Sequence, residues 1–274
     1  MRVERQPAWV LHARPWRETS LLVEVFTREH GRVGLVARGV RGPRAQPLRA
    51  ALQPLQAITL DFQLRGELAQ LRQAEALGPG AGLQGDALMA GFYLGELVLR
   101  LAPRLDPLPG LFDAYGAAVA ALAEAAGPAD LGWVLRGFER RLLEELGIGL
   151  DWAIDATGEP VDPAARYRLD PEDGAVRDRG AARGGTLRGA TLLAFAEGER
   201  PDAEGLRELR DGLRGLLAHH LGPRGLASWG MLGELARVAP AAPSAAAPAQ
   251  GSGSASSSSA ASRHDANASD DNGA

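Results

Sequence analysis

The sequence contains no cysteine, which excludes disulfide bonds, a thiolate nucleophile and the usual cysteine-bound structural zinc site. Lysine is absent as well, so all 30 basic residues are arginine. Arginine favours forked, planar contacts with phosphates and stacking on rings, although a bias in genomic base composition produces the same replacement. The chain also lacks an apolar run of the roughly 20 residues that a membrane span needs, and its first residues do not resemble a signal peptide. We therefore expect a cytoplasmic protein that does not enter a membrane.

Charge is distributed unevenly along the chain. The formal net charge is −4, which by itself argues against a nucleic-acid partner. Residues 1–80, however, hold 12 arginines against 7 acidic residues, whereas residues 81–274 hold 18 arginines against 27. An asymmetry of this kind is typical of a localised cationic surface on an acidic scaffold.

The first 80 residues are rich in short segments of Val, Leu, Ile and Phe, which predict strands. Between two of these segments, Glu29, His30 and Gly31 lie where a hairpin should turn, and glycine supplies the positive φ that such a turn needs. Five strands in a domain of this size favour a closed β-barrel of the OB type, which binds oligonucleotides or oligosaccharides. The predicted strands cover residues 8–14, 19–27, 32–40, 52–64 and 67–77.

The rest of the chain predicts an α+β protein, because the pattern changes to helical spacing after residue 80. Residues 81–238 are expected to form a helical domain that carries a small β insert at about residues 151–185. Residues 239–274 consist mainly of Ala, Ser, Pro, Gly and Asp without an aromatic residue, and we expect a disordered tail. The predicted helices cover residues 86–101, 108–125, 130–146, 192–196, 203–221 and 226–238.

Motifs that carry catalysis are weak in this sequence. Gly80–Gly85 matches the dinucleotide-binding pattern G-x-G-x-x-G, but helices follow it instead of a parallel βαβ unit, so we interpret it as a linker. His219 and His220 are neighbours on a predicted helix and point apart by about 100°, which favours a helix-terminal pair over a metal site. No nucleophile-elbow or Walker pattern is present. We therefore expect no enzymatic activity, no cofactor and no metal.

One loop combines aromatic and cationic side chains. Trp16 lies between Arg14 and Arg17, and further arginines follow on the next strand and in a glycine- and proline-rich loop. Stacking of bases on an aromatic ring together with attraction of the backbone is how sequence-tolerant proteins hold single strands. Two simpler interpretations stay open, namely that Trp16 packs on the end of the barrel and that the loop is merely solvated. The candidate DNA-binding residues are Arg14, Trp16, Arg17, Arg32, Arg38, Arg41 and Arg44.

Several segments resemble the bacterial RecO family of recombination mediators, over about residues 7–235. The segment Trp9–Ser20, with the sequence WVLHARPWRETS, is the most specific of them. The others are residues 25–27, 31–39, 52–55, 93–97, 111–115 and 158–161.

The resemblance implies an OB barrel and a helical domain without nucleotide hydrolysis. Family members bind single- and double-stranded DNA, anneal complementary strands, engage the acidic C-terminal tail of single-stranded DNA-binding protein, and with RecR help load RecA, with an indirect link to RecF. The same activities are expected here, at the nucleoid. The resemblance also assigns tail binding to one helix, with apolar surface and cationic rims contributed by Leu135, Arg136, Phe138, Arg140 and Leu142, although the apolar members fit a core helix equally well.

Three points qualify this interpretation. Some family members carry a four-cysteine zinc finger in the insert, and this chain, which has none, must hold the insert by packing. An OB-fold RNA-binding factor is the alternative that the basic barrel also allows, and contacts to 2′-hydroxyls would distinguish it. An enzyme built on His219 or His220 would instead require acidic side chains to converge on them.

Overall fold

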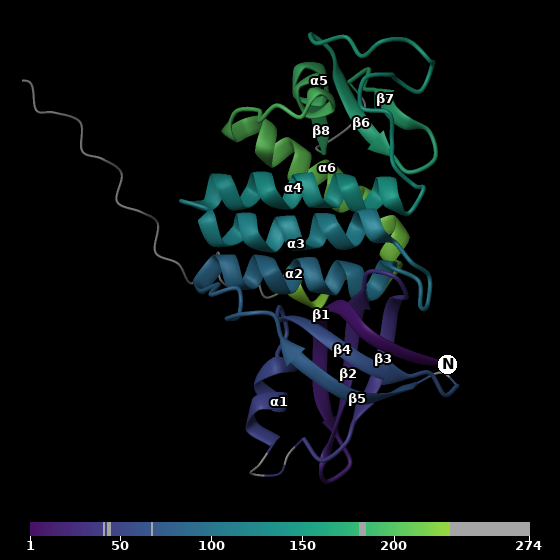
Figure 1. Ribbon diagram of the computed structural model, residues 1–274. Coiled ribbons are helices and arrows are strands. Elements are labelled where there is room, and N and C mark those ends of the chain that lie inside the picture. Colours follow the sequence, from purple (N-terminus) through teal and green to yellow (C-terminus); the bar gives the residue numbers. More distant parts are fainter. Residues whose placement is uncertain (41, 43–44, 67, 181–184, 231–274) are drawn as a thin grey trace, which may run out of the picture. The chain divides into compact units, whose positions relative to one another are not determined.

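The computed structural model describes residues 1–40, 42, 45–66, 68–180 and 185–230. Its first part is a closed barrel in which the strands follow the order β1-β2-β3-β5-β4 and β4 pairs back to β1 (Figure 1). The β3–β5 pairing is parallel and the others are antiparallel, as in the predicted OB-type barrel. The strands are β1 (Arg2–Trp16), β2 (Ser20–Thr27), β3 (Gly31–Ala37), β4 (Ala57–Gln63) and β5 (Ala69–Ala76).

The barrel is closed around aliphatic and aromatic side chains. Alternate residues of β2 and β3 point inward, and Val23, Val25 and Leu35 are fully buried there. Ile58 and Phe62 fill the same interior from β4. The predicted turn is also present, since Gly31 has a φ of 62° at the start of β3.

A short helix interrupts the region that the sequence suggested was a loop followed by a long strand. Helix α1 (Gln46–Ala51) begins with Pro47 in its first turn, a position where the missing N–H of proline costs nothing. Leu52 follows it and is fully buried in the barrel core. The expected strand over residues 52–64 is therefore wrong in its first part, and β4 starts at Ala57.

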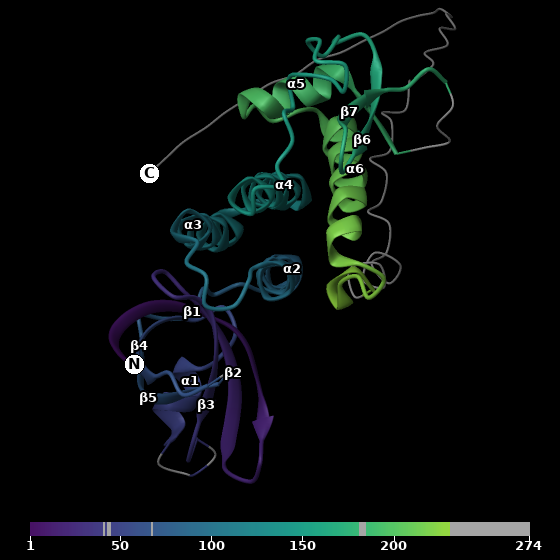
Figure 2. The same ribbon diagram turned by 90° about the vertical axis from the view of Figure 1, so that its right-hand side faces the viewer.

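Five helices form most of the second part. Helices α2, α3 and α4 lie side by side, and α6 crosses this layer (Figures 1 and 2). The insert is a sheet of order β7-β6-β8, so the expected hairpin has a third strand. The elements are α2 (Gly85–Leu101), α3 (Pro109–Glu124), α4 (Pro128–Glu145), β6 (Arg166–Asp170), β7 (Gly174–Arg177), β8 (Thr186–Arg188), α5 (Gly189–Glu197) and α6 (Ala203–Leu221).

The insert contains a tight turn held by a single carboxylate. Asp155 Oδ1 accepts hydrogen bonds from the backbone and hydroxyl of Thr157 at 2.8 and 2.6 Å. Asp155 also donates its backbone N–H to Glu159 O at 2.8 Å. Hydrogen bonds and packing thus hold this part of the insert, where the sequence offers no cysteine for a metal.

Apolar side chains join the barrel to the helices. The Trp9 ring meets the Tyr115 ring edge-on at 5.6 Å, and Phe26 lies 5.7 Å from Phe112. Backbones also approach closely, because a Cβ built on Gly31 would lie 2.0 Å from the carbonyl oxygen of Asp106. These contacts fix one end of the barrel against α3 and the segment that precedes it.

Two expectations concern the end of the chain. The predicted helix over residues 226–238 is observed at 227–230, and its remainder lies outside the described residues. The predicted tail, 239–274, also lies outside them. Within the part of the chain that the structure describes, no helix has the length and apolar character to span a bilayer.

Candidate nucleic-acid interface

The tip of the β1–β2 hairpin lies at the end of the barrel that points away from α2, α3 and α4 (Figures 1 and 2). Trp16 pairs with Ser20 across this tip, and Leu21 pairs with Ala37 at the end of β3. Arg38 follows Ala37 directly, so its backbone starts beside the hairpin. The structure therefore brings the tip of the hairpin and the end of β3 together.

A row of outward-facing residues crosses the barrel beside this tip. The strand register connects Arg14 to Leu22, Leu22 to Val36, and Val36 to Gln70. Arg14 is exposed and the other three are half-buried, as expected for the outer face of a barrel. The next row, Ala13, Val23, Leu35 and Ala69, faces the interior, with all but Ala13 fully buried.

We call this surface the hairpin face. It combines exposed arginines, a tryptophan with 38% of its surface exposed and a half-buried strip that a base could lie on. Its members are Arg14, Trp16, Arg17, Leu22, Val36, Arg38 and Gln70.

The three arginines of the hairpin face have no acidic partner in the part of the chain that the structure describes. Among the described residues, neither Arg14, Arg17 nor Arg38 forms an ion pair, and all three are exposed. Arg17 lies in the tight turn with a φ of 54°, a conformation that non-glycine residues rarely adopt. Uncompensated guanidinium groups on one end of a domain make that end attractive to a polyanion.

The other predicted DNA-binding residues are placed differently. Arg41 and Arg44 lie outside the described residues, in the segment that follows Val40. Arg32 points to the opposite end of the barrel, where only 14% of its side chain is exposed. Its Nε donates to Ala102 O at 3.0 Å, and its Nη1 lies 3.5 Å from Glu24 Oε2. Burial lowers the pKa of Arg32, and the nearby Arg104 lowers it further.

Most of the predicted tail-binding residues on α4 are in the core. Phe138 and Leu142 are buried at 3% and 0% exposure, so they cannot line an open groove. Arg136 is buried as well, and its Nε donates to Glu139 Oε2 at 2.7 Å. Tyr93 donates to Glu139 Oε1 at 2.6 Å, and burial raises the pKa of this tyrosine well above 10.0. Of the five residues, only Leu135 and Arg140 are partly accessible.

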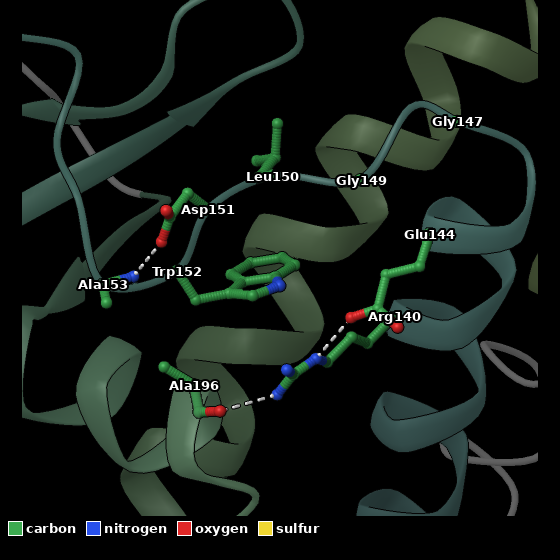
Figure 3. A pocket seen from close by; sticks show the side chains of 9 residues that line it. All are labelled: Arg140, Glu144, Gly147, Gly149, Leu150, Asp151, Trp152, Ala153 and Ala196. Carbon is green, nitrogen blue, oxygen red and sulfur yellow. Dashed lines mark hydrogen bonds and ion pairs between the residues drawn. The ribbon is translucent and has the colours of Figure 1, made fainter. Parts of the chain in front are cut away.

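Arg140 does line an open pocket of about 620 Å³ at the C-terminal end of α4 (Figure 3). Its Nε donates to Glu144 Oε1 at 2.8 Å, and its Nη1 donates to the carbonyls of Phe195 and Ala196. The indole N–H of Trp152 is buried without a hydrogen-bond acceptor, on the side of the ring that faces Arg140 and Glu144 (Figure 3). The lining of the pocket thus combines a tryptophan whose buried N–H has no acceptor among the described residues with apolar carbon from Leu150, Ala153 and Ala196.

The histidine pair lies near the C-terminal end of α6. Within the described residues, no group of three His, Asp or Glu side chains is arranged to hold a metal ion. His219 and His220 contact each other edge-on at 5.2 Å near the end of α6. Burial lowers the pKa of His220, and His219 adds to this effect.

Comparison with known proteins decides the family. The family model described as Recombination protein O N terminal matches residues 1–79, and the one described as Recombination protein O C terminal matches residues 83–230. The chain belongs to the RecO family. The resemblance noted in the sequence is thereby confirmed.

Curated relatives in the RecO family match almost their whole length. The DNA repair protein RecO of Xanthomonas campestris pv. campestris (strain B100) is 58% identical over 241 residues, which cover 86% of this chain and 99% of the relative. The DNA repair protein RecO of Stenotrophomonas maltophilia (strain K279a) is 57% identical over 239 residues, with the same coverage. RecO membership places the chain among proteins of DNA repair and recombination.

Three members of the hairpin face were not predicted from the sequence. Leu22, Val36 and Gln70 join the RecO barrel surface only through the strand register. The alternation of buried and accessible residues in β2 and β3 was a signal for the first two. Leu22 precedes the buried Val23, and Val36 lies between the buried Leu35 and Ala37. Trp152 was missed too, and only its burial without an acceptor draws attention to it.

Proposed function

We propose that this RecO-family chain is a recombination mediator that binds single- and double-stranded DNA on the hairpin face and anneals complementary strands. With RecR it helps load RecA onto strands coated by single-stranded DNA-binding protein, at the nucleoid and without a cofactor. The observation that supports DNA binding is the gathering of Arg14, Arg17 and Arg38 around Trp16 without a carboxylate partner among the described residues. A surface of this composition suits a strand of any sequence.

Annealing on this face requires charge neutralisation and no covalent step. Two complementary strands repel each other through their phosphates, and arginine side chains that contact one strand release its counterions and lower that repulsion. In the half-buried row, Leu22 and Val36 give bases an apolar surface next to those cations, and Gln70 adds a polar amide beside them. Binding by this mechanism weakens steeply as salt rises.

Charge reversal of the hairpin face tests the proposal. The variant Arg14→Glu, Arg17→Glu, Arg38→Glu should lose affinity for a fluorescent oligothymidine on the order of 100-fold or more, and the salt dependence of binding should fall by about three phosphate contacts. Annealing should fall in parallel while the melting temperature stays close to that of the wild type, because these side chains are exposed.

A control variant with the same change in net charge distinguishes two causes of lost DNA binding, namely loss of contacts at the hairpin face and the change in the net charge of the whole protein. The variant Arg168→Glu, Arg177→Glu, Arg179→Glu reverses three exposed arginines on and beside β6 and β7. It should keep most of the DNA affinity. Equal losses in both variants, or normal annealing by a folded hairpin-face variant, would contradict the proposal, and preference for RNA of matched sequence would favour an RNA-binding factor instead.

We further propose that the Arg140 pocket receives the acidic C-terminal tail of single-stranded DNA-binding protein. The support is the unused indole N–H of Trp152 next to Arg140 and apolar carbon, which suits a peptide that ends in a carboxylate beside an apolar side chain. Trp152→Phe keeps an aromatic six-membered ring and removes the five-membered ring with its N–H, so it should weaken binding of a peptide with the tail sequence about 10-fold.

The matched control for the pocket lies one residue from Arg140. Arg141 is on the same helix, is 49% exposed and pairs with Glu144 and Glu145, but it does not line the pocket. Arg141→Gln should therefore bind the peptide like the wild type, measured by fluorescence anisotropy. Unchanged binding by Trp152→Phe would exclude this site for the tail.

A further inference from the structure

Helix α6 has a cationic outer face. Its inner side is aliphatic and fully buried, with Leu209, Leu213 and Leu217 in the core. Arg207, Arg210 and Arg214 lie on the opposite side at spacings of three and four residues, and all are exposed. This face carries a row of arginines although residues 81–274 are acidic in total.

Most described arginines after residue 80, including Arg210 of α6 itself, are neutralised by carboxylates. Ion pairs engage Arg104, Arg136, Arg140, Arg141, Arg166, Arg168, Arg177, Arg188, Arg200 and Arg210. Among the described arginines after residue 80, those without an ion pair are Arg100, Arg179, Arg207, Arg214 and Arg224. Four of these five gather along or beside α6.

Specific contacts hold the unpaired arginines near one line. Arg207 Nε donates to Ala203 O of its own helix at 3.1 Å, and the Arg214 guanidinium lies 4.7 Å from the centre of the Trp229 ring. Arg100 Nη1 donates to Gly225 O at 2.8 Å, which places this side chain beside Arg224. None of these contacts neutralises the charge. Of the exposed acidic residues on the same side, Asp211 pairs with Arg210 at 3.0 Å and Glu204 lies 3.8 Å from Arg188.

The row is long enough for several phosphates. Arg207 and Arg214 are two helical turns apart, about 10 Å, and the helix continues for roughly another 10 Å to Leu221 before Arg224. Phosphates on one strand of a duplex recur about every 3.4 Å along the axis. A strand that follows α6 therefore meets successive guanidinium groups without bending.

We propose that the α6 face, formed by Arg207, Arg214, Arg224 and Arg100, is a second phosphate-binding surface that holds a second nucleic-acid strand. The inference rests on the proposed DNA binding at the hairpin face and extends it. The two surfaces lie on different parts of the molecule, the hairpin tip on the barrel and α6 on the helical layer (Figures 1 and 2). One chain can thus hold two strands at once, which annealing requires.

The composition of the α6 face favours a nucleic-acid backbone over an acidic protein segment. Between Arg207 and Leu221 the other exposed residues of α6 are Arg210, Asp211, Gly215, Ala218 and His219, and the large aliphatic side chains of the helix face the core. A peptide would find no apolar groove there for its side chains, whereas phosphates need only cations.

Counting bound strands tests the proposal. Native mass spectrometry of the full chain with a 12-nucleotide oligothymidine should give two oligonucleotides per wild-type chain. The variant Arg207→Glu, Arg214→Glu, Arg224→Glu should bind one, with annealing reduced at least 10-fold, and the hairpin-face variant should also bind one. The insert control Arg168→Glu, Arg177→Glu, Arg179→Glu should still bind two.

The outcomes separate this inference from the proposed function. One oligonucleotide on the wild-type chain, or two on the α6 variant, overturns the inference and leaves the hairpin face untouched. Two on the hairpin-face variant and one on the α6 variant refutes the hairpin face and supports α6. A polyglutamate peptide serves as a probe for an acidic protein partner. If the α6 variant loses binding to this peptide but binds as many oligonucleotides as the wild type, the inference is overturned in favour of a protein partner.

A second variant covers a possible loss of folding. Because Arg214 packs on Trp229, the double variant Arg207→Gln, Arg224→Gln keeps that contact. It should melt like the wild type and lower the salt dependence of binding to the second strand by about two phosphate contacts. A folded double variant with unchanged salt dependence counts against the α6 face.

Discussion

At the end of the barrel that contacts the helices, Arg28 lies 2.9 Å from Asp113, and Arg32 and Arg104 share Glu24. At the hairpin end, Arg14 and Arg17 are exposed without a carboxylate partner among the described residues. Residue type and strand pattern are the same at both ends. At the end that contacts the helices, arginines therefore join two parts of the chain through ion pairs with acidic residues. At the hairpin end, the arginines stay available to a polyanion.

The difference follows from what covers each end. Helices α2 and α3 and the segment between them bring Arg104 and Asp113 to the barrel, and burial of Glu24 to 12% side-chain exposure makes its pairing with both arginines necessary. No described helix of the second part covers the hairpin tip (Figure 2). The guanidinium groups there keep their hydration and cost the fold nothing.

Removing the shared acid should give the largest effect on this comparison. Glu24→Gln leaves the half-buried guanidinium of Arg32 and that of Arg104 without a counter-charge, and it should lower the free energy of unfolding by about 1–3 kcal/mol. DNA affinity of the folded variant should stay within about twofold of the wild type, because the hairpin face is untouched. Urea unfolding followed by circular dichroism and oligothymidine anisotropy measure the two quantities.

A crossed pair of single substitutions sharpens the result. Arg32→Gln should destabilise the fold and spare DNA binding, whereas Arg14→Gln should weaken DNA binding and change stability by less than about 0.5 kcal/mol. If Arg32→Gln weakened DNA binding as much as Arg14→Gln did, the division between the two ends would be wrong.

The sequence predicted the barrel and the loop that carries Trp16 between the first two strands because both follow from local signals. Strand alternation, the Gly31 turn and the Arg-Pro-Trp-Arg segment are each contained within a few residues. It did not separate Arg32 from Arg14, since the partners of Arg32 are Glu24 on another strand and Ala102 beyond α2. Pairing of charges distant in sequence is a tertiary property.

Helix α4 illustrates the same limit. Its periodicity predicted correctly that Leu135, Phe138 and Leu142 share one side, but periodicity does not say whether that side meets solvent or another helix. Burial of Phe138 and Leu142 resolves this in favour of the core. The pocket beside Arg140 depends on Trp152 and Ala196, which come from two later segments, and no local pattern could join them.

The exposed pair Arg28–Asp113 should give the smallest effect, and the size of this effect depends on pH. Hydrogen bonding from Arg28 lowers the pKa of Asp113 from 3.8, so the ionised carboxylate is favoured in the folded state. The pair therefore contributes its full stability above the ordinary pKa near 3.8 and loses it as the pH falls through the lowered value. Asp113→Asn should be less stable than the wild type at pH 7, and urea unfolding should show the difference shrinking as the pH falls through that range. Glu124→Gln, on the same helix without an ion pair among the described residues, should show no such convergence, and a constant difference for Asp113→Asn would mean that the pair does not join the barrel to α3 by charge.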